Sequence, residues 1–253
     1  GKDKRNSFFA LATRYISDLE QQKKFSRISS EKPRIKRFKE FLEGREITFK
    51  EIDEALLGRF QIHLKVHRNI NDRTIANHLV VIRTIYNLAI REKIIDRKDY
   101  PFGKGKVVIK FPPSQKLGLS AKEINDLESV VLEDKKENHA RNAWLLSFCF
   151  AGARCSDVLR MKWTDFNDGR FFYQMGKNQK PLSMKIPEKA KKFLSYLSNL
   201  RSDDSDYLFP EMRNINLDDP KSEYRTIVNT NKKFNKYLEL VAKKIKLKKP
   251  LTM

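Results

Sequence analysis

The most informative segment of the sequence is residues 152–163, GARCSDVLRMKW. An apolar helical pattern over about 138–150 precedes it, and a short helix is predicted around 156–161, so Arg154 stands at the corner between two helices. A guanidinium at such an interior corner is costly to bury without an anionic partner. That partner is either Asp157, three residues further on, or an anion from outside the chain. The local sequence leaves both interpretations open.

The residues around this segment predict a small α+β unit. Ser120 and Glu123 form a capping box, with Leu119 and Ile124 as its hydrophobic staple, so a helix is expected to begin there. Two short strands are predicted at about 170–175 and 182–186, flanking the turn at residues 176–180. Further helices are expected from Pro187 to about 200 and from about 228 to 244. This pattern predicts a small antiparallel sheet among helices.

The first half of the chain reads almost entirely as helix. Amphipathic spacing predicts helices over about 7–23, 30–43 and 72–94, and a capping box of Thr48 and Glu51 predicts the start of another. In the second of these helices Pro33 should fall in the first turn, where a missing N–H is tolerated. Four such helices with short connections form a small bundle. The fold class is therefore predicted as mainly α, with a four-helix bundle followed by an α+β unit.

Proline and glycine residues cluster between the two halves. The segment from Tyr100 to Gly118 contains three prolines and three glycines besides several lysines, and reads as a linker. We therefore predict domains at residues 1–103 and 119–253, with an interdomain linker at 104–118.

The charge balance indicates a polyanionic partner. Among 253 residues, 53 Lys and Arg face 32 Asp and Glu, which gives a net charge of +21, while 40% hydrophobic residues allow packed cores. Nucleic acid is the favoured partner, and the alternatives are an anionic membrane surface or a merely solvated surface. An RNA-binding module is less favoured because no aromatic stacking signature is present. No apolar run reaches the length of a membrane span, and no signal-peptide pattern opens the chain.

Neither the cysteines nor the histidines predict a metal or cofactor site. Cys149 and Cys155 look like small core residues in a reducing compartment. His63 and His67 can share a helix face, but no further ligand lies nearby in the sequence. We expect no metal and no cofactor.

Residues 152–163 resemble the first active-site arginine motif of the tyrosine recombinases, the family of phage and transposon integrases. That motif reads roughly Gly-x-Arg-x-Ser-Glu-x-x-x-Leu-x-Trp, and here Asp157, Met161 and Trp163 take its acidic, leucine and aromatic places. The order of elements is also similar, since a capped helix precedes the arginine and a strand-turn-strand with lysines follows it. The first four helices resemble the family's core-binding, SAM-like domain.

The resemblance implies a reaction and roles for particular residues. In this family a tyrosine attacks a DNA phosphate, expels a 5′-hydroxyl and forms a 3′-phosphotyrosyl link. Arg154 would clamp the phosphate, because a guanidinium presents forked donors and stays charged, and Asp157 would support it. Lys177 would protonate the leaving hydroxyl, with Lys180 in the same turn as its competitor.

The chain departs from the family pattern at its end. The second cluster of such proteins, His or Lys, two residues, then Arg, followed later by the tyrosine, usually comes after a phrase like the final residues 250–253, PLTM. None of the eight tyrosines has the right context, and Tyr237 reads as an ordinary helix residue. The sequence as it stands is therefore expected to bind DNA without cleaving it. The alternative, if Met253 is the natural end, is a non-catalytic regulator or architectural protein with the same fold.

The resemblance also implies how DNA is held. Such proteins close a clamp around the duplex, with the linker lysines Lys104, Lys106, Lys110 and Lys116 against the backbone, and assemble as tetramers on paired sites. They would act in the bacterial cytoplasm, encoded by the bacterium or a phage, with no membrane partner. The expected DNA-binding residues are Lys32, Arg34, Lys36 and Arg37 in the second helix, Arg73, Thr74, Asn77 and His78 in the fourth, and Lys116 and Lys180.

Overall fold

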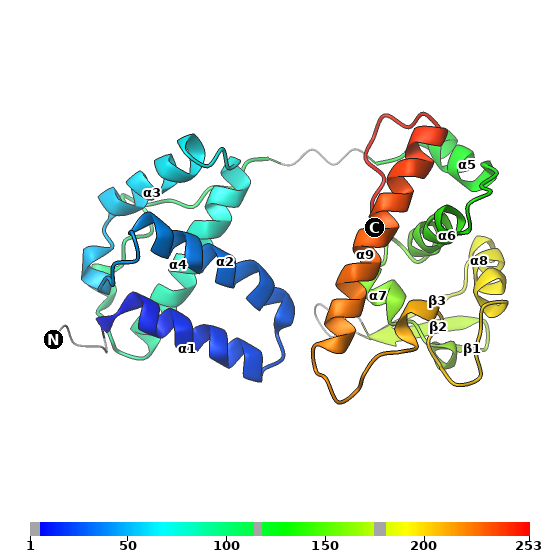
Figure 1. The fold of residues 1–253 in the computed structure, drawn as a ribbon, viewed down its shortest axis with the longest axis horizontal. Helices are drawn as coiled ribbons and strands as arrows, with labels where there is room; N and C mark the ends of the chain where they lie inside the picture. Colours follow the sequence, from blue (N-terminus) through cyan, green and yellow to red (C-terminus); the bar gives the residue numbers. More distant parts are fainter. Residues whose placement is uncertain (1–5, 114–117, 175–180) are drawn as a thin grey trace. The chain divides into compact units, whose positions relative to one another are not determined.

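The computed structural model describes residues 6–113, 118–174 and 181–253. The chain divides into two compact units, Gly1–Gln115 and Lys116–Met253 (Figure 1). Each unit has its own cluster of buried apolar side chains, so each is held together by a separate hydrophobic core.

Unit 1 is a bundle of the four predicted helices. They are α1 (Phe8–Gln21), α2 (Phe25–Phe41), α3 (Glu54–Val66) and α4 (Asp72–Arg91), with short 3₁₀ turns η2 (Phe49–Glu51) and η3 (Arg97–Asp99). The core centres on aromatic rings, and Phe38 lies 5.6 Å from Phe8 and 4.9 Å from Phe60 between ring centroids. Tyr86 is fully buried, and its hydroxyl lies 2.5 Å and 2.9 Å from the carbonyl oxygens of Phe49 and Ile52.

The start of α2 differs from the prediction. The helix begins at Phe25, so Pro33 lies inside it, and the expectation that Pro33 falls in the first turn is wrong. The additional turns are stabilised by contacts within α2 and with α1 and the core of unit 1. Ile28 packs against the core, and the side chain of Arg27 donates a hydrogen bond to Glu31 at 3.0 Å and another to the hydroxyl of Tyr15 in α1. These contacts offset the hydrogen bond that a proline cannot donate.

The Thr48–Glu51 capping box is present, but it opens η2. The following helix, α3, begins after Asp53, whose side chain accepts a hydrogen bond from the backbone of Leu56 at 2.7 Å. The predicted start was therefore correct as a cap and misplaced by one short turn, because a local pattern does not distinguish a 3₁₀ turn from the first turn of a helix.

Unit 2 combines helices with a small sheet at its edge. The helices are α5 (Ala121–Ser129), α6 (Lys135–Cys149), α7 (Cys155–Leu159), α8 (Glu188–Ser198) and α9 (Ser222–Lys244), with 3₁₀ turns η4 (Trp163–Asp165) and η5 (Pro210–Met212). The strands β1 (Phe166–Asn167), β2 (Arg170–Gln174) and β3 (Pro181–Lys185) pair antiparallel in that order, with Phe171 opposite Met184. The predicted fold class, mainly helical with a small antiparallel sheet, is confirmed. The strand β1 was not predicted.

The long helix α9 packs along α6 and contacts α7 (Figure 1). It begins at Ser222, earlier than the predicted start near residue 228, because Asp219 and Ser222 close a turn that leads directly into it. In the parts of the chain that the structure describes, no helix is both apolar and long enough to cross a bilayer.

Candidate functional site

The corner that carries Arg154 is formed by a tight reversal of the backbone between α6 and α7. Ala151 and Gly152 both adopt positive φ, 57° and 72°, a conformation that glycine tolerates readily. Ser147 holds the reversal together, because its carbonyl accepts hydrogen bonds from the backbone of Gly152 and Ala153, and its hydroxyl donates to Ala153 O at 2.6 Å. Arg154 then stands as the N-cap residue of α7. The predicted corner is thus present.

Arg154 and Asp157 contact each other, but unequally. The Nη1 atom of Arg154 lies 3.8 Å from Oδ2 of Asp157, and their side chains are 54% and 4% exposed. At this distance the contact is an ion pair without a close hydrogen bond. The guanidinium therefore remains accessible to an external anion, while the carboxylate is enclosed beside it.

The sheet approaches the same corner. The pKa of Tyr173 in β2 is raised, mainly by burial and also by the charge of Asp157, while the charge of Arg154 opposes this rise. Tyr173 therefore lies within electrostatic range of both residues. The strand β2 ends one residue later, at Gln174.

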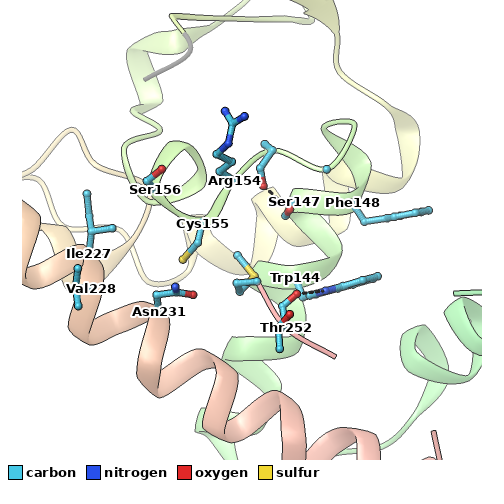
Figure 2. A pocket seen from close by; sticks show the side chains of 13 residues that line it. Trp144, Ser147, Phe148, Arg154, Cys155, Ser156, Ile227, Val228, Asn231 and Thr252 are labelled. Atoms are coloured by element: carbon cyan, nitrogen blue, oxygen red, sulfur yellow. Dashed lines mark hydrogen bonds between the residues drawn. The ribbon is translucent and has the colours of Figure 1, made fainter. Parts of the chain in front are cut away.

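Beside Arg154 lies an open pocket of about 510 Å³ (Figure 2). Its walls come from α6, α7, α9 and the last residues of the chain; they include Trp144, Phe148, Ile227, Val228, Asn231 and Thr252. The rings of Trp144 and Phe148 are stacked, with centroids 5.7 Å apart. Figure 2 shows the guanidinium of Arg154 extending away from the other labelled side chains. The pocket therefore has mainly apolar walls, and the guanidinium of Arg154 points away from them (Figure 2).

The last residues of the chain are anchored at this pocket. The indole nitrogen of Trp144 donates a hydrogen bond to Thr252 O at 3.1 Å, and the backbone of Met253 donates to Asn235 Oδ1 at 2.8 Å. Leu251 is buried in the core of unit 2. The chain therefore returns to the Arg154 corner after α9 ends.

Another arginine of the segment 152–163, Arg160, joins α7 to α9. Arg160 donates two hydrogen bonds to Glu223, from Nε at 3.1 Å and from Nη2 at 2.8 Å. This forked pair was not predicted, because nothing in the local sequence links residues so far apart.

In unit 1 the predicted DNA-binding residues lie on α2 and at the start of α4, and these two helices pack together. Lys32, Lys36 and Arg73 are exposed, whereas Arg34, Arg37, Thr74 and Asn77 are half-buried. Arg73 also donates to Pro112 O at 3.3 Å and lies 5.8 Å from the ring centre of Phe111. Within the bundle, the structure therefore leaves these side chains partly or fully accessible.

The prediction that His78 contacts DNA is wrong. Its side chain lies on the core face of α4 against Phe60, and the residue is 5% exposed. Burial, together with the nearby charges of Arg34 and Arg37, lowers the pKa of His78 to about 4. Helical phase explains the error, since position 78 shares its face with the buried Ile75 and Ile82.

Three predicted residues, Lys116, Lys177 and Lys180, lie outside the described residues. Over residues 6–113, 118–174 and 181–253, no group of three or more His, Cys, Asp or Glu side chains is placed to hold a metal ion. Tyr237 is partly buried in α9 against the core of unit 2, as expected of a helix residue.

Comparisons with known proteins agree with this architecture. Residues 7–107 match the family model described as the phage integrase SAM-like domain. A lambda integrase tetramer bound to a Holliday junction matches 90% of this chain and 66% of its own, at 15% identity and a TM-score of 0.61. The Tn1549 transposon integrase in complex with a circular intermediate DNA matches 86% of this chain and 73% of its own, at 12% identity and a TM-score of 0.61. No curated protein sequence matches the chain.

The chain spans just under two thirds of the lambda integrase chain in that tetramer, 66%. At such low identity the solved structures establish a common fold, and a common fold alone does not establish a reaction. Residues 7–107 are therefore similar to the phage integrase SAM-like domain, and the chain has the fold of the lambda and Tn1549 integrases.

Proposed function

We propose that this chain binds double-stranded DNA and serves site-specific DNA recombination of the tyrosine-recombinase type, such as integration or excision of a mobile element. The observation that carries the proposal is the exposed guanidinium of Arg154, held at a hydrogen-bonded corner beside an open pocket. The net charge of +21 supports a polyanionic partner. Integrases of this fold have been solved with DNA, and this supports a DNA phosphate as the anion that Arg154 binds.

In the proposed reaction a tyrosine oxygen bonds to a DNA phosphorus as the bond from phosphorus to the 5′-oxygen breaks. Arg154 binds the non-bridging oxygens, where negative charge grows, and such preorganised donors favour the transition state. Asp157 orients Arg154 through their ion pair. Lys177, or Lys180 in its place, gives a proton to the leaving 5′-oxygen. We assign the nucleophile to none of the eight tyrosines of this sequence.

The proposed DNA contacts in unit 1 are Lys32, Arg34, Arg37, Arg73, Thr74 and Asn77. The lysines of the predicted linker, Lys104, Lys106, Lys110 and Lys116, add further positive charge. Contacts of these kinds to phosphate fix the position of a protein on DNA without reading its sequence. Because a lambda integrase relative is a tetramer on a Holliday junction, we propose that four copies act on paired sites.

Binding of a fluorescent DNA duplex tests the proposal in the chain as it is. We expect Arg154→Ala to weaken binding roughly tenfold or more, since a charge-assisted contact to phosphate is lost. The matched control is Arg201→Ala, an arginine of unit 2 that lies over the ring of Trp163. Absence of duplex binding would overturn the proposal. Binding that does not depend on Arg154 would instead favour a non-catalytic DNA-binding protein with this fold.

A further inference from the structure

The hydroxyl of Ser147 does not bond back along its own helix. In α1, α4 and α5 a hydroxyl donates to the carbonyl oxygen four residues earlier, as seen for Thr13, Thr84 and Ser129. Ser147 lies in the last turn of α6, and its hydroxyl instead donates forward to Ala153 O at 2.6 Å, beyond the end of the helix (Figure 2). This hydrogen bond therefore spans the reversal that leads to Arg154.

The carbonyl group of Ser147 closes the same reversal. It accepts hydrogen bonds from the backbone of Gly152 at 3.0 Å and of Ala153 at 3.2 Å. The first of these is the six-to-one bond of a Schellman motif, in which the helix ends at a left-handed residue, here Ala151 with a φ of 57°. A residue with a β-carbon adopts this conformation at an energetic cost, so the reversal depends on the contacts that compensate for it.

Ala153 is thus held by Ser147 on both sides of its backbone. Its N–H donates to the carbonyl of Ser147, and its C=O accepts from the hydroxyl. That C=O belongs to the planar peptide group that also contains the backbone nitrogen of Arg154. The hydroxyl of Ser147 therefore fixes the plane of the peptide that enters Arg154.

The backbone on the other side of Arg154 is fixed by α7. The carbonyl of Arg154 accepts hydrogen bonds from the backbone of Asp157 at 2.8 Å and of Val158 at 2.9 Å. With the preceding and the following peptide both held, the direction in which the side chain of Arg154 leaves the backbone is set. The 3.8 Å contact with the carboxylate of Asp157 is longer than a hydrogen bond, so this backbone direction contributes to where the guanidinium points.

We propose that Ser147 is a positioning residue, whose hydroxyl orients the peptide between Ala153 and Arg154 and so directs the guanidinium of Arg154 toward a bound DNA phosphate. The inference rests on the proposed function. A side chain that is already oriented loses less conformational entropy on binding than one that is ordered only by its ligand. Ser147 itself needs no contact with DNA.

A double-mutant cycle measures whether Ser147 acts through Arg154. In the otherwise unchanged protein, Arg154→Ala should weaken binding of a fluorescent DNA duplex roughly tenfold or more. In a Ser147→Ala background the same substitution should weaken binding less than about threefold, because a misdirected guanidinium contributes little. Arg73→Ala, in unit 1, should weaken binding by the same factor in both backgrounds, because side chains that share no partner act additively.

Two variants of nearly equal shape separate the hydroxyl from packing. Ser147→Thr keeps the hydroxyl, whereas Ser147→Val replaces it by a methyl group, and both introduce a β-branched side chain into the helix. The full effect of Arg154→Ala should persist in the Ser147→Thr background and be diminished in the Ser147→Val background. A merely structural effect of the added bulk would be the same in both, and thermal unfolding checks that each variant is folded.

The matched control is Ser129→Ala, which removes a serine hydroxyl that donates to Asn125 O at 2.8 Å in α5. It should leave the contribution of Arg154 unchanged. An undiminished Arg154 effect in the Ser147→Ala background, or equal Arg154 effects in the Ser147→Thr and Ser147→Val backgrounds, overturns the inference while leaving the proposed function intact. Lack of any Arg154 effect in the unsubstituted protein overturns the proposed function itself.

Discussion

Arg154 and Asp157 form an ion pair whose two partners differ sharply in exposure, 54% against 4%. Their substitution should therefore affect stability differently. We expect Arg154→Ala to change the free energy of unfolding by less than about 0.5 kcal/mol, as for other exposed positions. Asp157→Ala should lower it by roughly 1–3 kcal/mol, because the change removes a buried charged side chain together with its ion pair to Arg154. Urea denaturation measures both values, and equal losses would contradict the arrangement.

Tyr86 should be a strong determinant of the stability of unit 1. Its buried hydroxyl lies near the carbonyl oxygens of Phe49 and Ile52, so Tyr86→Phe leaves buried acceptors without that donor. The expected loss is roughly 1–3 kcal/mol of unfolding free energy. Tyr100→Phe is the matched control, because this ring packs against Tyr86 and is itself partly exposed. A loss for Tyr100→Phe as large as that for Tyr86→Phe would refute the assignment.

His78 predicts a pH dependence of stability. Its pKa is lowered from 6.5 to about 4 in the folded protein, mainly by burial. Between these values the unfolded chain binds a proton that the folded chain does not, so the stabilising contribution of neutral His78 is complete above about pH 6.5 and is lost as the pH falls toward 4. Melting temperatures between pH 7 and pH 4.5 should fall less steeply in His78→Leu than in the unsubstituted protein. His67→Gln, at an exposed position, should not flatten the curve.

The accessible cations of unit 1 should set the salt dependence of DNA binding. Removing a phosphate-contacting side chain, as in Arg37→Ala or Arg73→Ala, should weaken binding of all duplex sequences alike and reduce the slope of log affinity against log salt by about 1. Arg14→Ala is the control, because Arg14 in α1 is paired with Glu92. The slopes come from anisotropy titrations at several salt concentrations. An effect confined to one DNA sequence would indicate a base contact instead.

Local patterns predicted local structure well. The capping box of Ser120 and Glu123 is present at the start of α5, since it involves only residues three apart. The corner at Arg154 was predicted from the change between two helical patterns, and the structure places it between α6 and α7.

Errors arose where distant contacts or helical phase decide the outcome. The start of α2 depends on Tyr15 in another helix, and β1, only two residues long, exists through its pairing with β2. His78 was counted with its exposed neighbours although it faces the core. The link from Arg160 to Glu223 joins residues 63 positions apart, and no periodicity reveals such a pair. The roles of Arg154, Lys177 and the DNA-binding residues stay predictions.

The packing of α9 on α6 has a consequence for synthesis of the protein on the ribosome. Unit 1 is built from helices that follow one another in the chain, so it can fold as it emerges. Unit 2 cannot complete its core beside the Arg154 corner until α9 and Leu251, which are translated much later, have left the exit tunnel. We therefore expect stalled nascent chains ending before Ser222 to retain DNA through unit 1 while Arg154 remains open to protease.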